Sequence, residues 1–315
     1  MTDLTIPHTP ARKRTPAASP SATRVTALTD VANRLRRFNP GAWGLRLVAL
    51  AYLALVVLIP LLVIVLEGLS SGAAVFVQNV TRPAAVHAMA LTVWTAVIMT
   101  IINLVMGTLT AYVLVVYEFP GKRWLSALID LPFAIPTLIS GVMLVLLYGP
   151  QTAVGAFFHK QLGIQIIFAP PGIVLALLFV SYPFVVRTVQ PALLSLDPDE
   201  VEAAATLGAS GWYTFRRVIF PAIRPALITG GLLSFARALG EFGALAVVAG
   251  NLPMRTQVAS VYIYGQIEAG NPQAAAGVSI VLLALAFGLT FGLDGWQAWQ
   301  RRKQDQSNLS DAVQV

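Results

Sequence analysis

Charge is scarce in this sequence. Only 11% of the 315 residues are charged, whereas a soluble domain carries about 25%. Apolar residues make up 57% of the chain, and its mean hydropathy is +0.73. This balance excludes an ordinary soluble globular protein. It also excludes disorder over most of the length, because disorder requires low hydrophobicity and a high charge density.

Several chemistry-bearing features are also missing. The chain has no cysteine, which excludes a disulfide scaffold, a thiolate metal site and a cysteine nucleophile. Its three histidines show no metal-ligand spacing, so we expect no metal site. No histidine lies in the middle of an apolar stretch, which argues against an intramembrane serine protease. No Gly-x-x-x-x-Gly-Lys-Ser/Thr stretch occurs, so this chain supplies no phosphate-binding loop for ATP.

Long apolar stretches dominate what is present. A membrane helix needs about 20 mostly apolar residues to cross the hydrocarbon core. Prolines inside the third and fourth stretches predict kinks rather than simple anchors. The sequence therefore predicts an all-α, polytopic membrane protein with about six transmembrane helices, at Leu45–Leu69, Val86–Val116, Leu125–Leu147, Gly172–Val189, Ala226–Ala249 and Ala274–Trp296.

The distribution of basic residues predicts the orientation. With the N-terminus inside, seventeen of the 21 Lys and Arg residues fall in cytoplasmic segments and three fall outside. Cytoplasmic loops of membrane proteins carry such an excess of Lys and Arg. We therefore expect both termini in the cytoplasm. The same bias accounts for the net charge of +7, so no nucleic-acid partner is expected.

The segment between the fourth and fifth stretches, residues 190–225, has the features of ordered structure. Asp197 is suited to an N-cap, Pro198 to the first helical position, and Gly208 to a helix end. A second amphipathic piece, Trp212–Phe220, follows before the next stretch. On these grounds alone, two interpretations stay open: a helix that rests on lipid headgroups, or a docking helix for a cytoplasmic partner.

A spaced pattern in this segment distinguishes the two. It consists of Glu202, Ala203 and Ala204, three residues, Gly208, nine residues, and then Val218, Ile219, Phe220 and Pro221. This pattern resembles the EAA loop of ABC importer permeases, with Val218 and Phe220 in place of Ile and Leu. The resemblance implies that Ala203 and Ala204 allow close approach to a separate ATP-binding subunit, and that Gly208 makes the turn.

Two further segments narrow the group. Tyr182–Pro191 resembles the fourth-span exit of sulfate/thiosulfate permease subunits of the CysT type, and Phe235–Ala244 resembles the fifth span of the sulfate, molybdate and tungstate group. Permeases for molybdate and tungstate share the Leu239–Gly243 core, so a molybdate/tungstate permease is the alternative. The resemblance implies a type I importer that moves sulfate or thiosulfate by alternating access. The resemblance also implies that this chain has no catalytic residues and no cofactor of its own, since ATP and Mg²⁺ belong to the partner ATPase.

Composition and the resemblance together predict an organisation, and the resemblance implies a set of partners. We expect a disordered basic tail over 1–44, a permease domain over 45–298 with the coupling loop at 196–221, and a cytoplasmic C-terminal tail over 299–315. The implied partners are an ABC ATPase dimer, a second permease of the CysW type, an extracytoplasmic sulfate-binding protein and membrane lipid. The implied location is the bacterial cytoplasmic (inner) membrane.

Arg237 and Glu241 are charged residues within the fifth predicted helix. Four positions apart, they are expected on one helix face. Ionised groups inside a membrane are costly and usually face a bundle interior or water. Two interpretations stay open: an ion pair that braces packing or a gate, or an arginine that lines the path and attracts a dianion while Glu241 sets its geometry.

Overall fold

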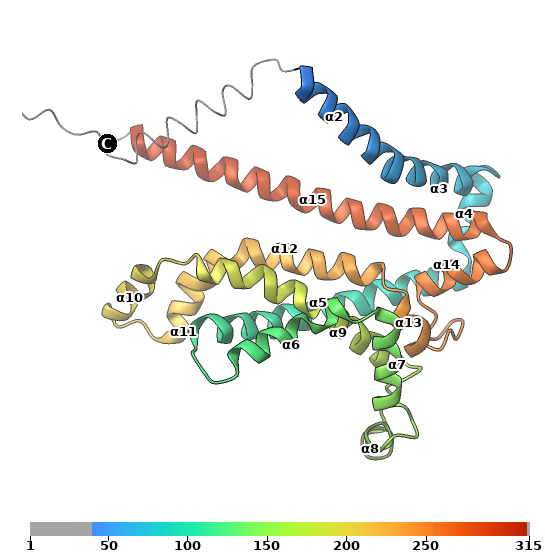
Figure 1. Cartoon of the computed structure of the whole chain (residues 1–315), viewed down its shortest axis with the longest axis horizontal. Coiled ribbons are helices and arrows are strands. Elements are labelled where there is room, and N and C mark those ends of the chain that lie inside the picture. Colours follow the sequence, from blue (N-terminus) through green and yellow to red (C-terminus); the bar gives the residue numbers. More distant parts are fainter. Residues whose placement is uncertain (1–39, 314–315) are drawn as a thin grey trace, which may run out of the picture. The chain divides into compact units, whose positions relative to one another are not determined.

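The computed structural model describes residues 40–313 (Figure 1). These residues contain helices and no strand, which confirms the predicted all-α class. The chain divides into two compact units, 1–62 and 63–315. The predicted tail over 1–44 lies outside the described residues except at its end, where a helix begins at Pro40.

The described part of the first unit is a single apolar helix. It comprises α2 (Pro40–Leu53), a π-helical turn η1 (Ala54–Leu58) and the start of α3 (Ile59–Leu69). The turn ends two residues before Pro60, whose missing N–H would interrupt an α-helical ladder. A wider turn, in which Ile59 N–H donates to Ala54 O, carries the helix past the proline. The apolar run Trp43–Leu69 is long enough to cross a membrane.

The second unit contains all the remaining helices. α4, α8 and α14 lie in stretches for which the sequence predicted no element. The bounds are α4 (Ala73–Thr81), α5 (Pro83–Val116), α6 (Lys122–Ala134), α7 (Thr137–Tyr148), α8 (Ala153–Leu162), α9 (Pro170–Leu194), α10 (Pro198–Thr206), α11 (Gly211–Thr214), η2 (Phe215–Ile219), α12 (Phe220–Leu239), α13 (Gly243–Val248), α14 (Ala259–Glu268) and α15 (Pro272–Val313).

Helix α9 is the centre of the second unit. It packs against both α5 and α12, and these three helices run side by side in Figure 1. More than half of its most apolar 18-residue window is buried, compared with none for the first span. Glycines permit the close approach: a Cβ on Gly107 would lie 2.9 Å from Cβ of Val185, and one on Gly230 would lie 3.3 Å from Cα of Val185.

The third predicted helix is broken in the structure. The continuous helix expected over Leu125–Leu147 is instead α6 and α7, bent by 111°. The break falls at Ile135 and Pro136. Proline disfavours helical geometry in the residue before it, and Ile135 is extended (φ −89°, ψ 125°). The described residues therefore contain five membrane-spanning candidates, or six if α6 and α7 count as one span.

The fifth predicted helix is shifted. Instead of Ala226–Ala249, the continuous helix runs over Gly211–Leu239 and ends before Gly240. The amphipathic piece over Trp212–Phe220 is therefore joined to the span without a break. The π-helical turn η2 ends two residues before Pro221, as η1 ends two residues before Pro60, and it carries the helix past the proline. A short helix, α13, follows the break at residues 240–242.

The two helices that follow breaks, α7 and α13, pack against each other. A Cβ on Gly141 of α7 would lie 2.8 Å from the carbonyl oxygen of Ala244 and 2.9 Å from its Cα. A Cβ on Gly243 would overlap Oγ1 of Thr137 and lie 2.9 Å from the amide nitrogen of Leu138. Because most of these neighbours are backbone atoms, which cannot rotate away, the contact requires glycine at both positions.

We expect Gly141→Ala to destabilise the permease by about 1–3 kcal/mol, the usual cost of overpacking. Gly265→Ala is the matched control, because a Cβ on Gly265 of α14 meets nothing within 4 Å. It should be neutral or stabilising by roughly 0.5–1 kcal/mol. Thermal denaturation of the purified transporter checks the pair, and equal midpoints for the two variants would contradict the close packing of α7 on α13.

Candidate functional site

The segment with the EAA pattern begins with a capped helix. Asp197 accepts a hydrogen bond from the amide of Asp199 at 3.0 Å, and Pro198 is the first residue of α10. At the other end, Gly208 N–H donates to Ala205 O and Ala209 N–H donates to Ala204 O, both at 3.0 Å. With Gly208 at φ +80°, these two bonds form a Schellman motif. The predicted cap and turn are confirmed.

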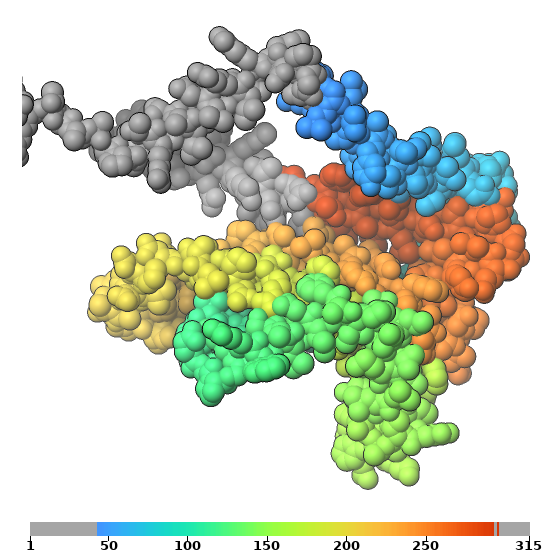
Figure 2. All heavy atoms as spheres, viewed as in Figure 1, coloured from blue at the N-terminus to red at the C-terminus, as the bar shows by residue number. Residues whose placement is uncertain are grey.

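The pattern residues lie on the surface of the second unit. Glu202, Ala203, Gly208 and Pro221 are exposed, and Ala204 is half-buried. Large apolar side chains accompany them: Leu207 is 88% exposed and Trp212 is 71% exposed. In Figure 2, α10 and α11, coloured yellow, form an exposed lobe at one end of the second unit.

The piece after the turn is anchored by its aromatic residues. Ser210 caps α11 by accepting from the amide of Tyr213 at 3.3 Å. The Trp212 ring stacks on the Phe215 ring with centroids 5.7 Å apart, and Ile219 is buried. The predicted apolar face is therefore graded, from a buried end at Ile219 to an exposed end at Trp212. Arg217 lies over the Tyr213 ring at 5.9 Å.

An ion pair between Arg187 and Asp130, which the sequence analysis did not predict, joins α9 to α6. Arg187 Nε donates to Asp130 Oδ1 at 2.7 Å, and its Nη2 donates to the other carboxylate oxygen. Its remaining donors bond to Ser126 and Gln190. The sequence placed Arg187 among the cytoplasmic charges, but it lies inside α9. The 57-residue separation gave no local signal of the pairing.

Arg237 and Glu241 do form an ion pair, but not on one helix face. Arg237 is in the last turn of α12, and Glu241 lies beyond the helix end, in the break before α13. The Nη1 of Arg237 is 2.7 Å from Oε2 of Glu241. The two side chains differ in exposure, 32% for Arg237 and 1% for Glu241. The carboxylate is therefore inside the protein, and the guanidinium is partly outside.

The second oxygen of Glu241 fixes the start of α13. Its Oε1 accepts the amide hydrogen of Ala244 at 2.9 Å. The backbone carbonyl of Glu241 accepts from the hydroxyl of Ser260 at 2.7 Å, which links the break to α14. Burial of an ionised carboxylate requires such partners, and Glu241 has a cation, an amide and a tethered backbone.

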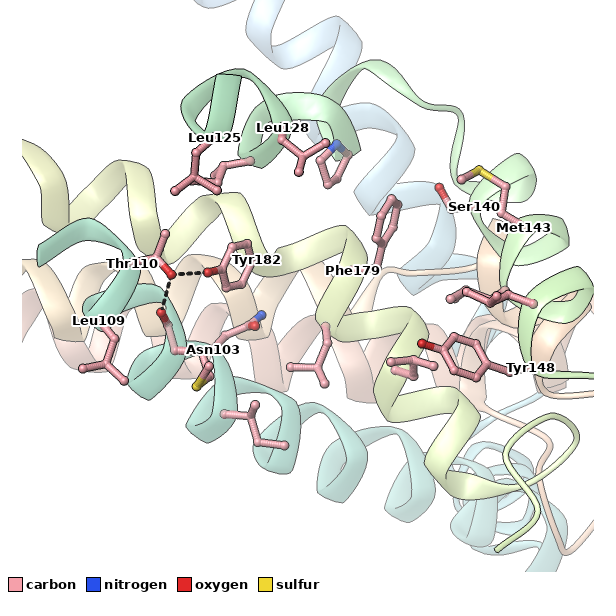
Figure 3. A pocket seen from close by; sticks show the side chains of 18 of the residues that line it. Asn103, Leu109, Thr110, Leu125, Leu128, Ser140, Met143, Tyr148, Phe179 and Tyr182 are labelled. Atoms are coloured by element: carbon pink, nitrogen blue, oxygen red, sulfur yellow. Dashed lines mark hydrogen bonds between the residues drawn. The ribbon is translucent and has the colours of Figure 1, made fainter. Parts of the chain in front are cut away.

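A cavity of about 800 Å³ in the second unit lies between α5, α9 and the α6–α7 pair (Figure 3). No charged residue lines it. Its polar groups are few: the hydroxyls of Thr110 and Tyr182 contact each other, and Asn103, Ser140 and Tyr148 lie apart along the wall. The Oδ1 of Asn103 and the Oγ of Ser140 are buried without a hydrogen-bond partner. This cavity suits apolar or weakly polar occupants.

A smaller pocket of about 390 Å³ lies at the α6–α7 break. Its wall includes the residues from Pro132 to Thr137 and, from α9, Val180 and Phe184. Arg237 is the charged residue of this wall. The broken helix thus separates an apolar cavity from a pocket that holds a cation, since Pro132 lines both.

Outside the candidate spans, Tyr264 and Glu268 interact on α14. The hydrogen bond and the negative charge of the Glu268 carboxylate raise the pKa of the Tyr264 phenol above 10.0.

The fold is that of an ABC importer permease. The chain is similar to a permease chain of a bacterial ABC transporter involved in the import of the acidic polysaccharide alginate, with a TM-score of 0.68 at 16% identity. That match covers 86% of this chain and 98% of the other. A second alginate transporter structure, in complex with a periplasmic protein that carries an alginate pentasaccharide, gives a TM-score of 0.67 at 17% identity over 79% of this chain and 91% of that one.

The sequence defines the class. The model of the family described as the inner membrane component of binding-protein-dependent transport systems matches residues 103–306. The chain belongs to this family, and it is a multi-pass membrane permease subunit of the ABC type. Permeases of this class work with a separate ATPase and an extracytoplasmic binding protein.

Within the class, the chain is similar to sulfate permeases named CysT. It is 40% identical to the probable sulfate transport system permease protein of Chlorokybus atmophyticus, over 78% of this chain and 85% of the relative. The sulfate transport system permease protein CysT of Synechocystis is 40% identical over 81% and 89%. That of Escherichia coli K12 is 38% identical over 84% and 95%.

Gly208→Ala should loosen the end of α10, because an L-residue in the left-handed region costs roughly 1–2 kcal/mol. Gly211→Ala is the control: it too has open space around its Cβ position, but no positive φ. Hydrogen exchange of the α10 amides should accelerate in the first variant and not in the second. Unchanged protection in Gly208→Ala would contradict the strained turn.

Proposed function

We propose that this chain is the transmembrane permease subunit of a sulfate/thiosulfate importer. The observation that carries the proposal is about 40% identity to CysT sulfate permeases over most of the length of both chains. The segments Tyr182–Pro191 and Phe235–Ala244, on which the resemblance rests, lie in α9 and around the α12–α13 break. Both therefore border the Arg237 pocket.

We propose an orientation with both termini in the cytoplasm. With Arg187 placed inside α9, sixteen basic residues remain on one side, compared with three on the other, and this excess supports the orientation through the positive-inside bias. The α10 lobe then faces the cytoplasm, since it follows α9 on the same side as the α5–α6 turn. The membrane is the bacterial inner membrane in this proposal.

We further propose that the α10 lobe couples the permease to its ATPase. Glu202, Ala203, Ala204, Gly208 and Pro221 carry the family's EAA pattern, and the lobe is exposed. Leu207 and Trp212 offer large apolar contacts there, as an interface core requires. ATP and Mg²⁺ bind to the ATPase dimer, and its closure moves the lobe as a rigid body.

The span joined to the lobe supports this transmission. Since α11, η2 and α12 form one continuous helix from Gly211 to Leu239, a displacement of the lobe reaches Arg237 without passing a flexible joint. We propose that Arg237 and Glu241 belong to the pathway or to its gate. The complete importer adds a second permease of the CysW type and a sulfate-binding protein outside.

Glu202→Arg should uncouple ATP hydrolysis from uptake, because it reverses the charge of an exposed residue on the docking helix. Glu200→Arg is the matched control, on the same helix but on a different face, since two positions are about 200° apart. We expect labelled-sulfate uptake to fall at least tenfold in the first variant, with the chain still in the membrane. Normal uptake in Glu202→Arg would remove the docking role.

Deletion of this chain should abolish uptake of labelled sulfate by intact cells. Excess unlabelled thiosulfate should compete with the remaining native activity, and molybdate should compete little. The measurement is initial uptake in cells with and without the chain, with each competitor in turn. Undisturbed sulfate uptake together with lost molybdate accumulation would overturn the substrate while leaving the permease class intact.

A further inference from the structure

The two pockets at the α6–α7 break differ in their suitability for an anion. The apolar cavity has no charged lining residue and few hydrogen-bond donors. A dianion that leaves water for such surroundings loses its hydration without compensation. The Arg237 pocket supplies a permanently charged guanidinium. Its volume of about 390 Å³ equals that of roughly a dozen water molecules at about 30 Å³ each, which is ample for a tetrahedral oxyanion that keeps several waters.

The guanidinium is available to an incoming ligand. Its ion pair with Glu241 runs through Nη1, and about a third of the Arg237 side chain is exposed. An arginine presents five donors in a planar fork, so a single carboxylate oxygen leaves donors for a second anion. Arg187 of α9 contrasts with it, since Asp130, Ser126 and Gln190 occupy its donors.

Glu241 cannot follow the guanidinium into the pocket. Its side chain is 1% exposed, Ala244 N–H holds its second oxygen, and Ser260 holds its backbone carbonyl. An anion that binds Arg237 therefore shares the cation with a fixed negative charge. The repulsion between the two anions limits how tightly the second one is held.

We propose that Arg237 contacts the transported tetrahedral oxyanion, and that Glu241 is a fixed counter-charge that keeps this contact weak. The inference rests on the proposed function and assigns the anion's contact within it. Weakness serves transport, because a site on a pathway must bind well enough to admit a substrate and loosely enough to release it. A lone arginine in low-dielectric surroundings would retain a dianion.

A purely structural ion pair makes a different prediction. If the pair only braces α12 against α13, removal of either charge breaks the same contact, and both variants change in the same direction. If Arg237 binds the oxyanion, the two variants change in opposite directions. Glu241→Gln keeps an amide oxygen that can accept from Ala244 N–H, so it removes the charge with little change in shape.

The experiment measures equilibrium binding of labelled sulfate to the purified complex of both permeases and the ATPase, without ATP or binding protein, at fixed ionic strength in chloride. Glu241→Gln should bind sulfate at least tenfold more tightly than the native complex, since it removes a unit charge beside the dianion. Arg237→Gln should lose at least tenfold. Arg237→Lys, which keeps the charge but not the fork, should fall between the native complex and Arg237→Gln.

Arg187→Gln is the control, because it removes an intramembrane arginine outside the pocket lining. It should lower thermal stability and leave sulfate affinity unchanged. Equal affinity in the native and Glu241→Gln complexes, or weaker binding in Glu241→Gln, would overturn the proposal. The absence of sulfate binding in both the native and the Glu241→Gln complexes would overturn it as well.

The same assay with labelled molybdate separates this inference from the substrate assignment. If the cell experiment moves the substrate to molybdate, opposite effects of the Arg237 and Glu241 variants on molybdate binding would still support the anion contact. If sulfate is the substrate and both variants weaken its binding, the contact is wrong and the sulfate permease stands.

Discussion

Backbone hydrogen bonding within apolar surroundings is the constraint on which this structure depends. A peptide group without a partner there costs several kcal/mol, so each interruption of a spanning helix has to be closed by other groups. At the α6–α7 break, Ile135 N–H still bonds back into α6. At the α12–α13 break, the Glu241 carboxylate accepts from the amide of Ala244, the second residue of α13, and the Ser260 hydroxyl donates to the backbone carbonyl of Glu241. A buried carboxylate thus completes the backbone at the same place where it pairs with Arg237.

Arg187 and Arg237 show how the surroundings give one residue type two different tasks. Arg187 has all its donor groups engaged across α6 and α9, and it holds two helices in register. Arg237 has one carboxylate and an open side. Arg187, whose three nitrogens all donate hydrogen bonds, therefore joins α6 to α9, whereas Arg237 keeps free donors and lines a pocket. Both are expensive to insert in a membrane, and the partners of each indicate what offsets that cost.

Much of this arrangement follows from sequence patterns. Hydropathy predicted the spans at α5, α9 and α15 to within a few residues, because apolar runs of this length have few alternatives. Asp197 and Gly208 predicted the ends of α10 because capping chemistry is local. The bend at Pro136 and the end of α12 at Leu239 were missed, since proline and glycine also occur inside membrane helices and their effect depends on neighbours. The Arg187–Asp130 pair depends on tertiary packing, which no spacing in the sequence encodes.

The π-helical turns before Pro60 and Pro221 change which side of the helix the following residues face. One extra residue in a turn rotates everything beyond it by about 100°. The side of the α11–η2 piece that carries Trp212 is therefore out of phase with the side of α12 that faces α9. The surface segment and the spanning segment therefore belong to one continuous helix, but their contact faces point in different directions around its axis. The wide turn thus sets the exposed face of the lobe and the buried face of α12 on different sides of one continuous helix.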